Sequence, residues 1–216
     1  MTEDSRYAAT RGDAYRLLAA CFYEPERELL LEEHLPENLT TLMSELEVPA
    51  DEACRLLAEG LQQASQEELL VEYSALFLGP FGAPAHPYGS VYLEQAGLLM
   101  GDSSMAVQKC YLEAGLTQKA EGPPDHIALE LEFMSFLINK AAEAEAAGDS
   151  ARQQDFARRQ GLFLSRFLAS WVIPFANAIR AHAQLAYYRA LADCLVIFIA
   201  TESHRHEAAM HVPAGP

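Results

Sequence analysis

Basic residues are scarce in this sequence. Lysine and arginine together number 15 against 31 aspartates and glutamates among 216 residues, and the formal net charge at pH 7 is -16. This balance opposes electrostatic attraction to a phosphate backbone or to an anionic membrane surface. We therefore expect no nucleic acid among the partners of the chain.

Long apolar runs and targeting signals are missing as well. The longest apolar run, residues 194–200, is far shorter than the roughly 20 residues that a transmembrane helix needs. The sequence begins MTEDSRYAAT, with acidic residues and no apolar stretch behind a basic start, so it resembles neither a secretory signal nor a transit peptide. We expect a cytoplasmic protein without stable insertion in a membrane.

Cysteine is rare, and the common motifs for metals and phosphates are absent. The four cysteines lie tens of residues apart, without a C-x-x-C pair or a nearby histidine at metal-ligand spacing. Phosphate-binding glycine motifs, the H-E-x-x-H zinc motif and the G-x-S-x-G nucleophile motif are also lacking. We expect reduced thiols, no metal site, no cofactor and no catalytic residue.

Period-two runs typical of β-strands are missing too, whereas apolar residues recur at helical spacing nearly everywhere. This pattern predicts an all-α fold. Ser65 and Glu68 form a capping-box sequence that opens one helix, and Asp125 is the expected N-cap of a long helix reaching about residue 147. A further helix is expected from about residue 150 to Pro174, because proline breaks helices. The polar tail from residue 202 is expected to fray.

Glycine and proline cluster at two places. Three prolines and two glycines exclude a helix from residues 79–87. At the second place, Gly122, Pro123 and Pro124 push the chain into extended geometry. We place a hinge there, between two helical subdomains. The expected boundaries are an N-terminal domain at 1–118, a Pro-containing hinge at 119–125, a C-terminal domain at 126–203 and a flexible tail at 204–216.

Two blocks of sequence carry a recognisable pattern. The first reads YSALFLGP at residues 73–80 and continues to PYGSVYL at 87–93; the second reads EGPPDHIALE at 121–130. They resemble the two signatures of the TorD/DmsD family, Y/W-x-x-L-F-x-G-P with a proline-rich segment ending in S-V-Y/W-L, and E-x-P-x-D-H. The resemblance covers nearly the whole chain, and one departure is His86, where the family more often has proline.

The resemblance implies a function and a site. Proteins of this family are chaperones that hold the twin-arginine leader and the apo form of a DMSO-reductase-family molybdoenzyme until its molybdenum cofactor is inserted, and then release it for export. They form monomers or domain-swapped homodimers, and some are reported to bind guanine nucleotides. The family's leader-binding residues match Tyr73, Leu76, Phe77, Tyr88 and Tyr92 in the first block and Asp125 and His126 in the second.

The chemistry of a twin-arginine leader agrees with this site. Two guanidinium groups favour carboxylate acceptors, for which Glu121 and Asp125 are available on either side of Pro124 at the hinge. The tyrosines supply broad amphipathic surface, although core packing is the competing explanation for the aromatic residues. The ordinary pKa of a histidine, about 6.5, would make a contact through His126 sensitive to pH near neutrality.

Three other functions remain open at this stage. The nitrate-reductase branch of the same family assembles enzymes without cleaved leaders. Asp125 beside His126 resembles half of a catalytic dyad, which allows a nucleotide-hydrolysing protein, although no serine or cysteine nucleophile accompanies them. The chain could also be a structural subunit of a reductase, which would then stay in the purified complex.

Overall fold

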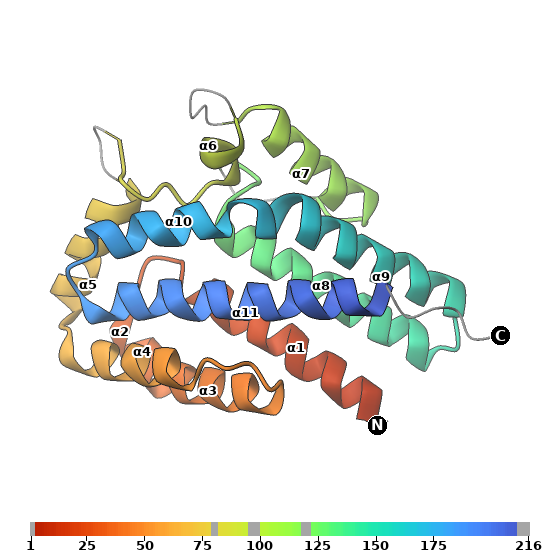
Figure 1. Ribbon diagram of the computed structural model, residues 1–216, viewed down its shortest axis with the longest axis horizontal. Helices are drawn as coiled ribbons and strands as arrows, with labels where there is room; N and C mark the ends of the chain where they lie inside the picture. Colours follow the sequence, from red (N-terminus) through yellow and green to blue (C-terminus); the bar gives the residue numbers. More distant parts are fainter. Residues whose placement is uncertain (1–2, 79–81, 95–99, 118–121, 211–216) are drawn as a thin grey trace.

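A computed structural model describes residues 3–78, 82–94, 100–117 and 122–210 of the chain (Figure 1). Within these residues all regular structure is helical, which confirms the expected fold class. The helices are α1 (Glu3–Ala20), α2 (Arg27–Glu32), α3 (Leu35–Glu45), α4 (Asp51–Gln63), α5 (Gln66–Tyr73), α6 (Gly89–Leu93), α7 (Asp102–Glu113), α8 (Ile127–Ala146), α9 (Ser150–Phe163), α10 (Ala169–His182) and α11 (Ala186–Met210), with π-helical turns η1 (Ser74–Leu78) and η2 (Leu164–Leu168).

Local sequence signals set several helix ends. The Ser65 hydroxyl accepts the backbone N–H of Glu68 at 3.2 Å, and the Glu68 carboxylate accepts the backbone N–H of Ser65 at 2.8 Å. This is the expected capping box. Helices α7 and α8 both end before a glycine in the left-handed region, Gly115 with φ +85° and Gly148 with φ +72°, where a side chain would be strained.

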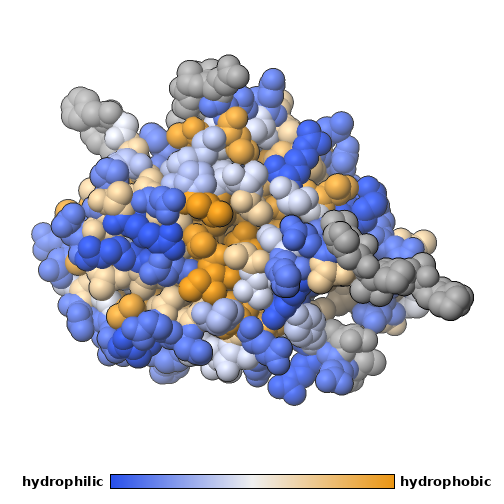
Figure 2. All heavy atoms as spheres, in the orientation of Figure 1, coloured by the Kyte–Doolittle hydropathy of each residue, from blue (hydrophilic) through white to orange (hydrophobic). Residues whose placement is uncertain are grey.

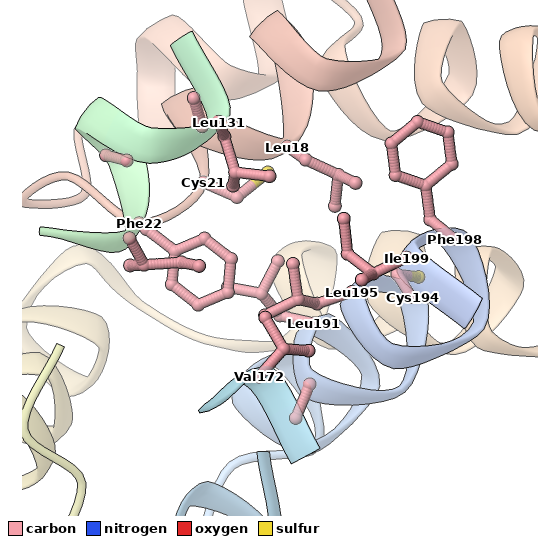
Figure 3. Close-up of a cluster of buried hydrophobic side chains, with 14 of the residues drawn as sticks. Leu18, Cys21, Phe22, Leu131, Val172, Leu191, Cys194, Leu195, Phe198 and Ile199 are labelled. Carbon is pink, nitrogen blue, oxygen red and sulfur yellow. The ribbon is translucent and has the colours of Figure 1, made fainter. Parts of the chain in front are cut away.

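The core is built by helices from both ends of the chain. Helix α1 packs along α8, and α11 packs along α4 and α10. Leu18 of α1 and Phe22, which follows α1, meet Leu131 of α8, Val172 of α10 and Leu195 of α11 in one buried cluster (Figure 3). This cluster joins segments on both sides of residues 119–125, and the division into two subdomains stays a prediction.

The expected helix end at Pro174 is wrong. Helix α9, the turn η2 and helix α10 run on without a break from Ser150 to His182, and Pro174 lies inside α10. A proline within a helix removes one hydrogen bond. Trp171 and Phe175 on either side of it are fully buried, so their packing outweighs the cost of the missing bond.

This continuous helix contains an 18-residue window that is long and apolar enough to cross a membrane by length and composition alone. Half of that window is buried against the rest of the protein, as in the core helix of a soluble protein, so it is weak evidence for a span. Figure 2 shows apolar side chains gathered between α10 and α11. Ile173 of α10 is 57% exposed.

The prediction that the chain frays from residue 202 is also wrong for the described part of the tail. Helix α11 continues to Met210. Glu202 is buried, and its carboxylate accepts two hydrogen bonds from the Arg11 guanidinium, at 3.0 and 2.7 Å. Arg205 donates to the backbone carbonyl of Leu46. These long-range contacts hold the polar end of the helix against α1 and α3.

The close approach of α4 and α11 gives a test of this packing. A Cβ added at Gly60 would lie 2.6 Å from the backbone nitrogen of Tyr187. We therefore expect Gly60→Ala to lower the free energy of unfolding by about 1–3 kcal/mol, although alanine inside a helix is favoured over glycine by about 1 kcal/mol. Urea denaturation measures the difference. The control is Gly12→Ala, whose nearest neighbour is the flexible side chain of Asn139 at 3.2 Å; equal effects of the two variants would contradict the close approach.

Candidate functional site: the joint between the signature segments

The two signature segments meet in space. Tyr88 and His126 form an isolated antiparallel bridge. The backbone N–H of Gly89 donates to the carbonyl of Asp125 at 2.9 Å, and the N–H of Ile127 donates to the carbonyl of Pro87 at 2.9 Å. We call residues 87–90 and 124–127 the joint. It fixes the start of α6 against the start of α8.

Asp125 has a different role from the expected one. It is only 1% exposed, and its Oδ2 atom accepts the backbone N–H of Ser90 at 2.6 Å, in the first turn of α6. The N-cap of α8 is His126, whose Nδ1 atom accepts the backbone N–H of Ala128 at 3.2 Å. The expectation that Asp125 caps α8 is therefore wrong, because its side chain turns to the unpaired N–H groups of a neighbouring helix.

His126 is neutral in the folded chain. Burial lowers the pKa of its imidazole to about 4, against the weaker opposing effect of the Asp125 charge. The ring lies between two tyrosines, nearly parallel to Tyr23 with the ring centres 6.2 Å apart and edge-on to Tyr88 at 5.3 Å. The expected sensitivity to pH near neutrality is thus wrong, since desolvation moves the titration well below that range.

Several residues of the first signature lie in the core. Tyr73, Leu76 and Phe77 are all buried, and the Phe77 ring packs against Tyr73 at 5.2 Å and Tyr188 at 5.8 Å. Burial raises the pKa of Tyr73 to about 12. In this conformation these three residues lie in the core and are not on the surface of the protein.

A buried polar network lies below the joint. The indole N–H of Trp171 donates to the Glu130 carboxylate at 3.1 Å, and burial raises the pKa of Glu130 well above its usual range. Tyr92 stacks on Trp171, with the ring centres 5.6 Å apart. A Cβ at Gly89 would lie 2.9 Å from the indole nitrogen, so only glycine lets α6 sit this close to Trp171. The carbonyl of Pro124, also buried, accepts the Tyr111 hydroxyl at 2.9 Å.

The accessible surface at and beside the joint is aromatic and acidic. Tyr23, which follows α1, is 40% exposed and donates its hydroxyl to the exposed Glu132 carboxylate at 3.0 Å. Tyr88 and His126 are half-buried beside it, and the neighbouring Glu24 is exposed. We call these five residues the joint face. Glu121, the other carboxylate expected here, lies outside the described residues.

A family model described as nitrate reductase delta subunit matches residues 44–177 of the chain. The chain belongs to this family, the TorD family. The chaperone protein TorD of Photobacterium profundum is 31% identical over 139 residues, 63% of each chain. The chaperone protein TorD of Aliivibrio fischeri is 26% identical over 208 residues, 92% of this chain and 95% of that protein. The first alignment thus spans slightly less than two thirds of the relative.

The resemblance to the TorD family that the two signatures predicted is confirmed. A crystal structure of a proposed redox enzyme maturation protein from Archaeoglobus fulgidus has the same fold, with a TM-score of 0.55 at 24% identity over 88% of this chain and 93% of that chain. The curated relatives are named as chaperones, in agreement with the expectation that the chain is not an enzyme. Among the described residues, no group of three or more metal-ligating side chains comes together.

The sequence did not point to three residues that lie around the joint. Tyr23 lies two residues before Pro25 and outside both signatures. Glu132 lies two residues after the second signature, and Trp171 lies 41 residues beyond Glu130. No spacing rule connects such distant positions. The packing of α1 against α8 brings Tyr23 to Glu132, and the hydrogen bond from Trp171 of α10 reaches Glu130 of α8.

The lowered pKa of His126 predicts a pH effect. As pH falls from about 6.5 to about 4, the unfolded chain binds a proton at this histidine before the folded chain does, so the free energy of unfolding decreases. His126→Asn keeps a side chain that can cap a helix and removes the titration. We expect its free energy of unfolding to depend less on pH in this window than that of the natural protein, as measured by urea denaturation. An imidazole NMR titration midpoint near 6.5 would contradict the burial of the ring.

Proposed function

We propose that this protein is a cytoplasmic chaperone that binds the twin-arginine leader and the apo form of a DMSO-reductase-family molybdoenzyme before cofactor insertion and export. Membership of the TorD family and the names of the relatives support the chaperone role. The observation that supports the leader as the ligand is the composition of the joint face. Its two tyrosines and neutral His126 lie beside the exposed carboxylates of Glu24 and Glu132.

The joint face has the chemistry that paired arginines need. A guanidinium group stacks on aromatic rings and forms paired hydrogen bonds with a carboxylate. A neutral imidazole does not repel it, and the pKa of His126 keeps this ring neutral at cytoplasmic pH. The net charge of -16 also attracts a cationic segment from a distance.

Magnitudes indicate which contacts set the affinity. Burial of about 300 Å² of apolar leader surface contributes about 7 kcal/mol before the costs of binding are subtracted. An exposed ion pair contributes only about 0–1 kcal/mol. The aromatic surface therefore sets the affinity, and the carboxylates set the register and the preference for arginine.

The buried signature residues act indirectly in this proposal. Leu76, Phe77 and Asp125 are buried, so a leader touches them only if residues 119–125 let the two halves of the molecule separate. Such an opening would also allow the exchange of halves between two copies, so the protein would exist as a monomer or a domain-swapped homodimer.

Assembly of a nitrate reductase is the second candidate. The description of the matching family model favours it. The two functions differ in the ligand, because a nitrate-reductase-type client lacks a cleaved twin-arginine leader. A client leader that binds only when its arginine pair is present would support the first function.

The aromatic part of the joint face can be tested with a matched pair of variants. Tyr23 and Tyr7 are equally exposed, at 40% and 42%, but Tyr7 lies near the start of α1, away from the joint. We expect Tyr23→Ala to weaken binding of a synthetic twin-arginine leader about tenfold, or about 1.4 kcal/mol, and Tyr7→Ala to leave it unchanged. Isothermal calorimetry measures both, with leaders taken from the reductases that the host encodes.

The carboxylates of the joint face can be tested with an altered leader peptide. Replacement of the arginine pair of the leader by two lysines should weaken binding to the natural protein, because lysine lacks the planar fork that pairs with a carboxylate. Glu132→Gln should reduce this difference between the two leaders. The proposal fails if no leader produces heat, or if Tyr23→Ala and Tyr7→Ala behave alike. Stoichiometric binding and turnover of a guanine nucleotide instead would favour the enzymatic alternative.

A further inference from the structure

A groove between α7 and α9 is lined by cationic side chains, although the chain as a whole is negatively charged. Lys109 of α7 and Arg158, Arg159 and Arg166 of α9 and η2 surround a cavity of about 350 Å³. These four are among only 15 lysines and arginines in the chain. We call this region the α7–α9 groove. In Figure 1, α7 lies along the hairpin of α8 and α9.

The floor of the groove is aromatic. Phe133, Phe163 and Phe167 line it, and Cys110 lies half-buried on its α7 side. The ring centres of Phe133 and Phe163 are 4.7 Å apart, so the floor is closely packed. Leu162 on the rim is 53% exposed. An apolar group that entered the cavity would therefore meet rings below and cations at the sides.

The apolar surface continues along α7 beyond the cavity. Met105 is 55% exposed and Leu112 is 58% exposed, and each lies about one turn from Lys109 on the same side of the helix. Methionine is common on surfaces that bind helices of varied sequence. A small ligand would fill the cavity alone and leave these side chains in water, whereas an elongated ligand would cover them.

The cations are only partly neutralised by the protein itself. Asp155 pairs with Arg158 at 2.6 Å and Arg159 at 2.7 Å, and Glu113 lies 3.8 Å from Lys109. Arg166 lies over the Phe167 ring at 5.5 Å and has no ion pair among the described residues. Four cations against two carboxylates leave a local charge of about +2, on a chain whose net charge is -16.

We propose that the α7–α9 groove binds an acidic amphipathic helix of another polypeptide. A helix of three turns matches the 12 residues of α7, about 18 Å in length. Its apolar side chains at i, i+4 and i+7 enter the cavity and cover Met105, Leu112 and Leu162, and its carboxylates pair with Lys109 and Arg166. The charge of the groove excludes the cationic leader, so this site is separate from the joint face and does not depend on the proposed function.

The reactivity of the Cys110 thiol can show whether a peptide occupies the α7–α9 groove, because Cys110 lines it. Cys21, Cys54 and Cys194 are buried, so Cys110 is the most accessible thiol among them. The probe is a peptide of about 15 residues, a length at which an isolated helix begins to be stable in water, with leucine and phenylalanine on one face and glutamate on the flanks. We expect it to slow the reaction of Cys110 with a thiol reagent at mildly alkaline pH, and to bind more weakly as salt is added.

The variants separate the charge of the groove from the charge of the whole protein. Lys109→Glu with Arg166→Glu reverses two cations at the groove, and Arg6→Glu with Arg16→Glu makes the same total change at two exposed arginines of α1. Fluorescence anisotropy of the labelled peptide should show at least about a tenfold loss of affinity in the groove variant, which corresponds to about 1.4 kcal/mol of binding free energy. The α1 variant should show little change. Circular dichroism confirms that both pairs fold.

The outcomes are decisive in either direction. The inference is supported if the acidic peptide protects Cys110 and loses affinity only in the groove variant, whether or not a twin-arginine leader binds to the protein. It is overturned if a peptide with every glutamate replaced by lysine binds equally well, or if no peptide protects Cys110. It is also overturned if the groove variant only converts a dimer of this chain into monomers. None of these results alters the test of Tyr23.

Discussion

The carboxylate of Asp125 is buried at the start of α6, where it accepts a hydrogen bond from the backbone N–H of Ser90 at 2.6 Å. A buried carboxylate is stable only where the protein supplies hydrogen bonds, so the segments 87–90 and 124–127 must stay paired. That pairing puts Gly89 against the Trp171 indole, and the indole in turn donates to Glu130 of α8. The position of α6 over α8 and α10, and with it the joint face, follows from this chain of contacts.

Charge is distributed over the surface in a way that separates two kinds of ligand. The joint face combines neutral rings with carboxylates, which suits a cationic segment, and the α7–α9 groove combines buried rings with arginines, which suits an acidic one. Burial of His126 helps to keep the first surface free of positive charge, because it lowers the pKa of the imidazole to about 4. If both proposals hold, a client can be bound at two points without competition between them.

One core joins the helices that carry these two surfaces. Side chains of α1, α8, α10 and α11 form one buried cluster (Figure 3), and the polar end of α11 is held by the pair of Arg11 and Glu202. Separation of the two halves of the chain at residues 119–125 would expose part of this apolar surface to water, at a cost of roughly 25 cal/mol per Å². Such a separation would therefore need a ligand or a second copy of the chain to cover the exposed area.

The sequence by itself determined the helical fold class, because this class depends on the period of the hydrophobic residues. It also determined the capping box at Ser65 and the glycine ends of α7 and α8, which depend on backbone chemistry within a few residues. The family followed from two contiguous motifs. It did not determine which signature residues are buried, that Asp125 serves α6 and His126 caps α8, or that α10 continues through Pro174. Those outcomes depend on contacts between segments far apart in the chain, such as Glu130 with Trp171 and Tyr23 with Glu132. Only the packed structure sets the burial of each group, and burial decides both its pKa and its availability to a ligand.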